Sequence, residues 1–199
     1  MKRRTEMGLT IVEALVTVSI IAILVAIITP VIVSMRNAAK IQTSVSRLQA
    51  IYLAVEVYRQ DYDGTDTYHS TYRYGLPPWS YFNQTLLGLP ASVWESPCGP
   101  DETIRFSSLA SRDGYIHYAA SMYEDIVASW PGGVTRGYFP RYQENSVLAL
   151  DAFCNKPGTH MRAPHTTKRA LAVLLSGQVI NRLQKGNAGW LDWYSRVAE

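Results

Sequence analysis

The stretch that decides the fold is residues 1–35, which read MKRRTEMGLTIVEALVTVSIIAILVAIITPVIVSM. Three adjacent cations stand near its start, and between Leu9 and Met35 the only charged residue is Glu13. Ala14 to Val33 is an apolar run of about 20 residues, long enough for a bilayer-spanning helix. The sequence therefore predicts a transmembrane helix over about 14–33, with the basic tip in the cytoplasm by the positive-inside rule.

The composition of the whole chain is that of a folded protein. Its 199 residues are 47% hydrophobic and 18% charged, which allows one modest domain and an additional element. The formal net charge is +3, and removing residues 1–8, which carry three cations and one anion, would leave +1. Since phosphate binding usually requires a strong basic surplus, no nucleic-acid partner is expected.

A plain membrane anchor or an ordinary signal peptide would also explain the apolar run. A signal peptidase needs small residues at the far end of the run, where Ile32-Val33-Ser34 is a poor match. This alternative leaves Glu13 unexplained, because an ionisable group at the edge of an apolar span costs about 3 kcal/mol unless it is paired.

The order Gly8-Leu9-Thr10-Ile11-Val12-Glu13, directly after a short basic leader, resembles the prepilin cleavage and methylation segment of type IV pilins and type II secretion pseudopilins. The resemblance implies that a membrane prepilin peptidase cuts after Gly8 and methylates the new N-terminus, Leu9. It also implies that Glu13 neutralises the N-terminal amine of a neighbouring subunit. Pro30 matches the position of a proline that can loosen the helix when pilin subunits enter the fibre. Leu9 stands where Phe is commonest in the family.

Beyond Met35 the pattern becomes amphipathic. Apolar side chains recur at spacings of three and four, as on one face of a helix: Ile41, Val45, Leu48, Tyr52, Val55 and Tyr58. Leu9 to about Asp61 is therefore expected to form one continuous helix, about 80 Å long. The predicted organisation is a leader over 1–8, a helical stem over 9–61 and a globular head over 62–199.

The expected fold class is α+β, with the long N-terminal helix packed against a C-terminal antiparallel sheet. Residues 62–100 are predicted to be an irregular connection, and Tyr115 to Trp130 fits a helix or, in its first half, a strand. Ser146 to Phe153 is strand-like. Leu171 to Leu175 and Gln178 to Leu183 are predicted to form a hairpin about Ser176-Gly177.

The two cysteines, Cys98 and Cys154, lie far apart and in no CxxC pair. If the head is outside the cytoplasm, a disulfide between them is the expected state. A zinc site with His160 and His165 is the alternative, although its spacing is loose. No motif indicates nucleophilic catalysis, and Asn187 to Glu199 has too few carboxylates for a calcium loop. Neither an enzymatic activity nor a cofactor is expected.

The function expected from the resemblance is that of a filament subunit, a pseudopilin or minor pilin. Its partners would be a prepilin peptidase, other pilin or pseudopilin subunits and the inner membrane, with one membrane pass and an extracytoplasmic head. A membrane-anchored extracytoplasmic binding or enzymatic domain remains the alternative. The sequence does not separate a secretion pseudopilus from a retractile or a competence pilus.

Overall fold

The computed structural model of the chain describes residues 10–61, 76–77, 88–99, 116–118, 138–155, 159, 161, 163–188 and 191–198. The expected cleavage residues Gly8 and Leu9 lie outside these ranges. The chain divides into two compact units, Met1–Ala39 and Lys40–Glu199. The predicted stem therefore crosses a boundary, since its second half belongs to the same unit as the head.

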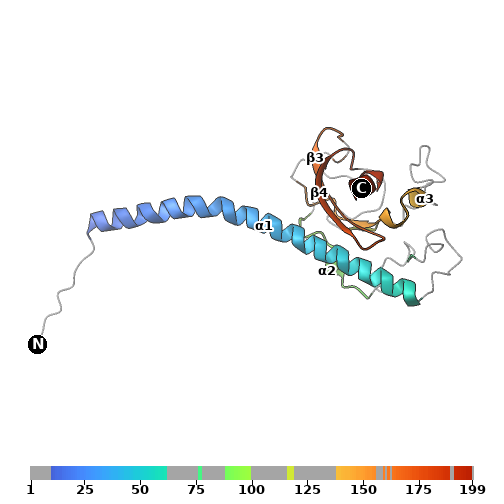
Figure 1. Cartoon of the computed structure of the whole chain (residues 1–199). Coiled ribbons are helices and arrows are strands. Elements are labelled where there is room, and N and C mark those ends of the chain that lie inside the picture. The colour runs from blue at the N-terminus through green and yellow to red at the C-terminus, as the bar shows by residue number, and fades with distance from the viewer. Residues whose placement is uncertain are drawn as a thin grey trace, which may run out of the picture. The chain divides into compact units, whose positions relative to one another are not determined.

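Helix α1 runs from Ile11 to Asp61 without interruption and contains Pro30 (Figure 1). The predicted continuous helix is thus present over these residues, and it ends at the residue where the sequence placed its end. In the second half of α1 the buried residues follow the spacing of one helical face: Ser44, Leu48, Ile51, Val55 and Tyr58. Three residues of the predicted stripe lie at its margin and are partly buried: Ile41, Val45 and Tyr52.

The head contains a four-stranded antiparallel sheet in the order β1-β2-β3-β4. Its strands are β1 (His117–Tyr118), β2 (Val147–Leu150), β3 (Thr167–Leu174) and β4 (Val179–Lys185). The predicted strand over Ser146–Phe153 is confirmed in shorter form as β2. In the segment Tyr115–Trp130, the structure has strand at β1, while residues 119–130 lie outside the described ranges.

The hairpin of β3 and β4 is confirmed, but its loop is longer than the two residues expected. The N–H of Gly177 donates to the carbonyl of Leu174 (3.0 Å), and the N–H of Leu174 donates to the carbonyl of Gln178 (2.9 Å). Leu175, Ser176 and Gly177 therefore form a three-residue loop. Gly177 has a φ of 81°. A glycine in this left-handed region is what a three-residue hairpin loop with a bulge requires.

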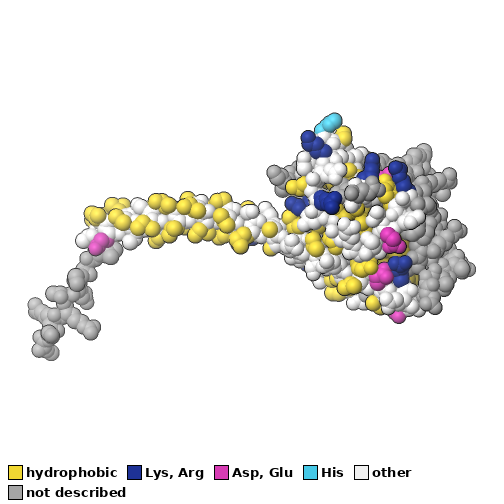
Figure 2. Space-filling model, viewed as in Figure 1, with side chains coloured by type: hydrophobic (Ala, Val, Ile, Leu, Met, Phe, Trp, Pro, Cys, Tyr) yellow, Lys and Arg dark blue, Asp and Glu magenta, His cyan; other side chains and the backbone are white. Residues whose placement is uncertain are grey.

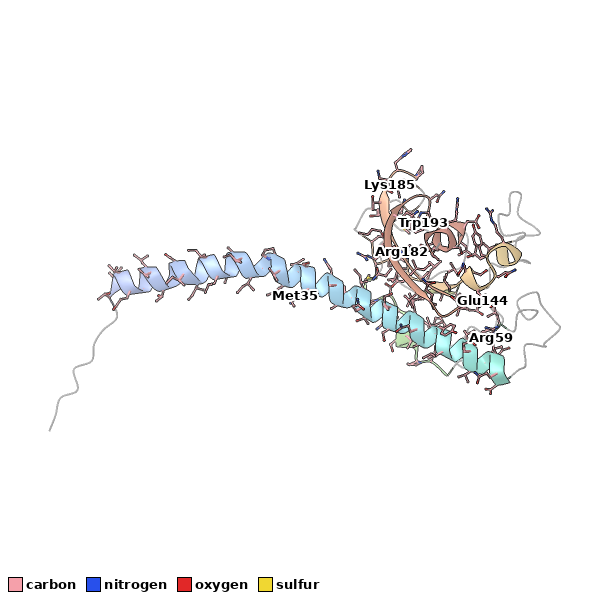
Figure 3. All side chains as sticks on the ribbon, viewed as in Figure 1. Met35, Arg59, Glu144, Arg182, Lys185 and Trp193 are labelled. Carbon is pink, nitrogen blue, oxygen red and sulfur yellow. A yellow bond between two sulfur atoms is a disulfide. The ribbon has the colours of Figure 1, made fainter. Side chains whose placement is uncertain are left out.

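Three short helices complete the described head: α2 (Ala91–Trp94), α3 (Tyr138–Tyr142), which continues into the 3-10 turn η5 (Gln143–Asn145), and α4 (Leu191–Ala198). Helix α4 was not predicted from the sequence, and it lies within Asn187 to Glu199, the segment with too few carboxylates for a calcium loop. Helix α4 packs against β2, β3 and β4. The indole nitrogen of its Trp193 donates to the carbonyl of Lys185 (3.1 Å) beside the end of β4 (Figure 3).

One hydrophobic core joins the stem helix to the sheet. Every residue of Val147–Leu150 in β2 and of Ala170–Leu174 in β3 is buried. Strands buried without alternation are covered on both faces. Leu48, Ile51 and Val55 of α1 belong to the same core cluster. The second half of the stem is therefore an integral part of the folded head.

Lys168 is a buried cation at the start of the hairpin. Its ammonium donates to the backbone carbonyls of Ala163 (2.5 Å), Thr166 (3.2 Å) and Gly186. Burial lowers the pKa of this lysine. These three bonds tie the loop before β3 to the residue that follows β4.

Candidate functional site

The start of α1 carries the first candidate site, and its geometry is a capping box. The backbone N–H and the hydroxyl of Thr10 both donate to Glu13 Oε2, at 2.9 and 2.8 Å. The N–H of Glu13 donates in return to the Thr10 hydroxyl (3.3 Å). Such reciprocal bonds satisfy backbone donors that a helix start leaves without partners.

Sequence reasoning singled out Glu13 but overlooked this local role. The signal was present, because Thr10-Ile11-Val12-Glu13 is the T-x-x-E pattern of a capping box. Glu13 therefore has a structural reason to be where it is, independent of any neighbouring subunit. Both bonds from Thr10 end on Oε2, and among the described residues none donates to Oε1. One oxygen of the carboxylate is thus available for a further donor.

The first half of α1 presents apolar side chains to its surroundings. From residue 11 to residue 40 every side chain is exposed except that of Ala14, which is half-buried. Hydrophobic side chains cover this part of the helix (Figure 2), and they point outward around Met35 (Figure 3). Within the described residues, α1 is the one helix long and apolar enough to cross a membrane, and none of its most apolar window is buried in the chain. An apolar surface of this size needs a nonaqueous environment.

Three hydroxyl groups in the apolar run are satisfied within the helix. Thr17 donates to the carbonyl of Glu13 (3.0 Å), Ser19 to that of Leu15 (2.8 Å) and Thr29 to that of Val25 (2.7 Å). In hydrocarbon an unsatisfied polar group is costly, so these bonds remove the main obstacle to burying the segment in lipid or between apolar helices.

Pro30 lies inside α1, and the helix continues through it. Proline has no N–H, so the carbonyl of Ala26 loses the donor that a helix normally gives it. The helix is therefore weakest at this turn. The expected local loosening at Pro30 stays a prediction.

A second polar site ties the stem helix to the head at Asp151. This carboxylate is fully buried just after β2. Its Oδ2 accepts from the hydroxyls of Ser44 in α1 (2.5 Å) and Ser96 in the loop after α2 (2.9 Å), and its Oδ1 accepts from the N–H of Phe153 (2.9 Å). Burial raises the pKa of Asp151, while these hydrogen bonds and the nearby Arg47 act in the opposite direction.

The disulfide adjoins this carboxylate. Cys98 and Cys154 are joined as expected, with their Cα atoms 5.1 Å apart. The N–H of Cys98 donates to the Ser96 hydroxyl (3.2 Å), and Arg47 donates to the carbonyl of Glu95. The bridge thereby fixes the loop after α2 to the segment after β2, beside the stem.

The histidines of the zinc alternative do not join the cysteines among the described residues. His165 is exposed, and His160 lies outside the described ranges. With both sulfurs in the disulfide, that alternative has lost its thiolate ligands. Asp151 is the acidic group that lies beside the two sulfurs. Its role was not predicted from the sequence, because its partner Ser44 lies 107 positions away in the chain.

Comparisons with protein-family models, with curated proteins and with solved structures gave no match to this chain.

Proposed function

We propose that this chain is a membrane-inserted filament subunit of the type IV pilin or type II secretion pseudopilin kind. The observation that carries the proposal is the combination at the start of α1: a carboxylate in the first turn of a helix whose next 26 residues, 14–39, contain one cation, Arg36, and no acid. Every side chain of that segment except that of Ala14 is exposed in the single chain. The order of residues 1–13 supports processing by a prepilin peptidase after Gly8.

In the proposed mechanism the inner membrane holds the subunit by the first half of α1 while the head lies outside the cytoplasm. Leader removal creates an ammonium group at Leu9. Inserted into an apolar fibre core, an unpaired ammonium and an unpaired carboxylate are each unfavourable, and pairing offsets much of that cost. The apolar helices pack together and the heads cover the outside. No step requires catalysis by this chain.

The capping box makes Glu13 better suited to this pairing. Thr10 holds Oε2, so the carboxylate is oriented before a partner arrives, and Oε1 remains for the ammonium of a neighbouring subunit. Less conformational entropy is then lost on assembly. Capping and pairing are therefore compatible roles of one side chain.

The capping box also favours a second candidate function. A plain anchor for an extracytoplasmic binding or enzymatic domain would use Glu13 only to begin its helix. The two candidates differ in one property, which is whether the negative charge of Glu13 is needed.

Glu13→Gln separates them, because glutamine also serves in a capping box but carries no charge. For a filament subunit we expect Glu13→Gln and Glu13→Ala to reduce sheared or cross-linked multimers alike, and Glu13→Asp to reduce them partly, since its reach is shorter. The amount of subunit in the membrane fraction should stay constant and serves as the loading control.

Thr10→Ala is the matched control. It removes the capping hydroxyl, at a cost of about 1 kcal/mol to the helix start, and keeps the charge. It should assemble far better than Glu13→Gln. Full assembly of Glu13→Gln together with a defect in Thr10→Ala would reject the pairing role and leave Glu13 its capping role alone. Absence of multimers from the unsubstituted chain would favour the plain anchor.

A further inference from the structure

We propose that reduction of the disulfide turns Cys98, Cys154 and Asp151 into a binding site for a thiophilic divalent cation such as Zn²⁺. The oxidised chain would lack this site. The inference concerns the head alone and does not depend on filament assembly.

The ligand atoms are already close together. One sulfur from each cysteine and a carboxylate oxygen of Asp151 all lie within 4.8 Å of one another. Asp151 Oδ2 is 3.5 Å from Cys154 Sγ. A disulfide sulfur carries no hydrogen, so this approach is a contact and not a hydrogen bond. With Zn–S near 2.3 Å and Zn–O near 2.0 Å, sulfur and oxygen ligands of a tetrahedral zinc are also about 3.5 Å apart.

The charges of the metal-bound site can balance. When the ion displaces the two thiol protons, two thiolates beside the buried carboxylate of Asp151 place three negative charges in a region of low water access, which would be strongly unfavourable without compensation. Arg47 is the cation that acts on Asp151 from the stem. A divalent ion together with Arg47 would balance the three anions, whereas Arg47 alone would leave two of them uncompensated.

The surrounding groups resemble the outer shell of a metal site. The hydroxyls of Ser44 and Ser96 orient the carboxylate of Asp151, and the Ser96 hydroxyl also accepts from the N–H of Cys98. Outer-shell partners of this kind fix ligand geometry in metal sites. The fourth ligand would be a water molecule or one of these hydroxyl oxygens, turned toward the ion.

The chemistry balances with a dithiol or phosphine as reductant. The reductant supplies two electrons, the Cys98–Cys154 bond breaks, and two protons from solvent give two thiols. Binding of the divalent cation then displaces these two protons, because the ligands are thiolates.

The test uses the full chain in detergent micelles, with a phosphine reductant and Co²⁺ as the probe. We expect the reduced chain to bind one Co²⁺ with a thiolate-to-cobalt charge-transfer band, and Zn²⁺ to displace it. The oxidised chain should show no such band. In native mass spectrometry, the metal-bound chain should be heavier than the reduced, metal-free chain by the mass of one metal ion less two protons.

Variants assign the ligands. Cys98→Ser should abolish the band, and Asp151→Asn should weaken binding by at least ~10-fold. Asp192→Asn, which changes an acid on α4 outside the cluster of Cys98, Asp151 and Cys154, is the matched control and should bind as the unsubstituted chain does. A reduced chain that binds no Co²⁺, or one whose near-ultraviolet circular dichroism is lost on reduction, would overturn the proposal. Equal affinity of Asp151→Asn and the unsubstituted chain would do so too.

Discussion

Asp151 shows how one buried side chain sets a pH dependence. Its pKa is raised from the ordinary value of 3.8, chiefly because it is removed from water. Between that value and the raised one, the folded state binds the proton more strongly than the unfolded state does. The free energy of unfolding therefore falls as the pH rises through this window. The groups that face the carboxylate are the hydroxyls of Ser44 and Ser96, the Arg47 guanidinium, the fully buried Tyr194 and the disulfide.

Asp151→Asn removes this titration and keeps a similar shape. Relative to the variant, the unsubstituted chain should lose stability as the pH rises above about 4, because only it must expel a proton from a buried site. Urea unfolding of both proteins over a series of pH values, followed by near-ultraviolet circular dichroism, measures the difference. Parallel pH profiles would show that Asp151 titrates as it does in the unfolded chain.

Gly186 is a position where the backbone tolerates no side chain. Its φ is 147°, and a Cβ placed there would lie 2.1 Å from the indole nitrogen of Trp193. That indole is buried and hydrogen-bonded to Lys185, so it cannot move away cheaply. Gly99 provides the control, because its φ is also positive, at 82°, while nothing lies within 4 Å of an added Cβ.

We expect Gly186→Ala to lower the free energy of unfolding by about 1–3 kcal/mol more than Gly99→Ala does, since it adds overpacking to the backbone strain. Thermal unfolding followed by tryptophan fluorescence compares the two. If Gly99→Ala proved as damaging as Gly186→Ala, the contact with Trp193 would not be the cause.

At the scale of elements, the buried stripe of the stem helix combines apolar packing with a polar contact to the head. Ser44 donates to Asp151, and Leu48, Ile51 and Val55 continue the same face into the core. A buried carboxylate that loses a donor keeps its desolvation cost. Loss of the Ser44 hydroxyl should therefore lower the free energy of unfolding by more than the loss of an exposed hydroxyl would.

Ser44→Ala should lower the free energy of unfolding of the head by about 1–3 kcal/mol. Ser46→Ala is the matched control, because Ser46 is exposed on the same helix and its replacement should change stability by less than ~0.5 kcal/mol. Urea unfolding of the disulfide-bonded proteins measures both. A loss of the same size in the two variants would argue against the bond to Asp151 as the cause, since alanine has the higher helix propensity and propensity alone would raise stability.

Elements with a strong periodic pattern were predictable from the sequence. The second half of the continuous helix was predicted from apolar residues at spacings of three and four. The hairpin was predicted from two strand-like runs on either side of a Ser-Gly turn. Helix α4 was not predicted because its eight residues are too few to show a clear helical period. Leu191 and Tyr194 are nevertheless spaced as on one buried face of a helix. The role of Asp151 was not predicted because its partners, Ser44 and Ser96, are distant in sequence. A contact of this kind leaves no local sequence pattern.

At the scale of the molecule, two environments are built into one chain. Residues 40–199 bury a core of their own, whereas the segment 11–39 exposes nearly all its apolar side chains, and three of its hydroxyls bond to carbonyls of the same helix. That division is what a subunit needs if it is stored in a membrane and then packed by its helix into a fibre. The proposed filament role joins these properties to the order of residues 1–13.

The mature N-terminus is the measurement that tests this account most directly. Gly8 ends a basic leader, so the chain isolated from membranes of its own cells should begin at Leu9 and carry an N-methyl group. Intact-mass analysis, with sequencing of the N-terminal peptide, decides the point. A chain that begins beyond Ser34, or one that retains residues 1–8 in cells with an active prepilin peptidase, would contradict the proposal.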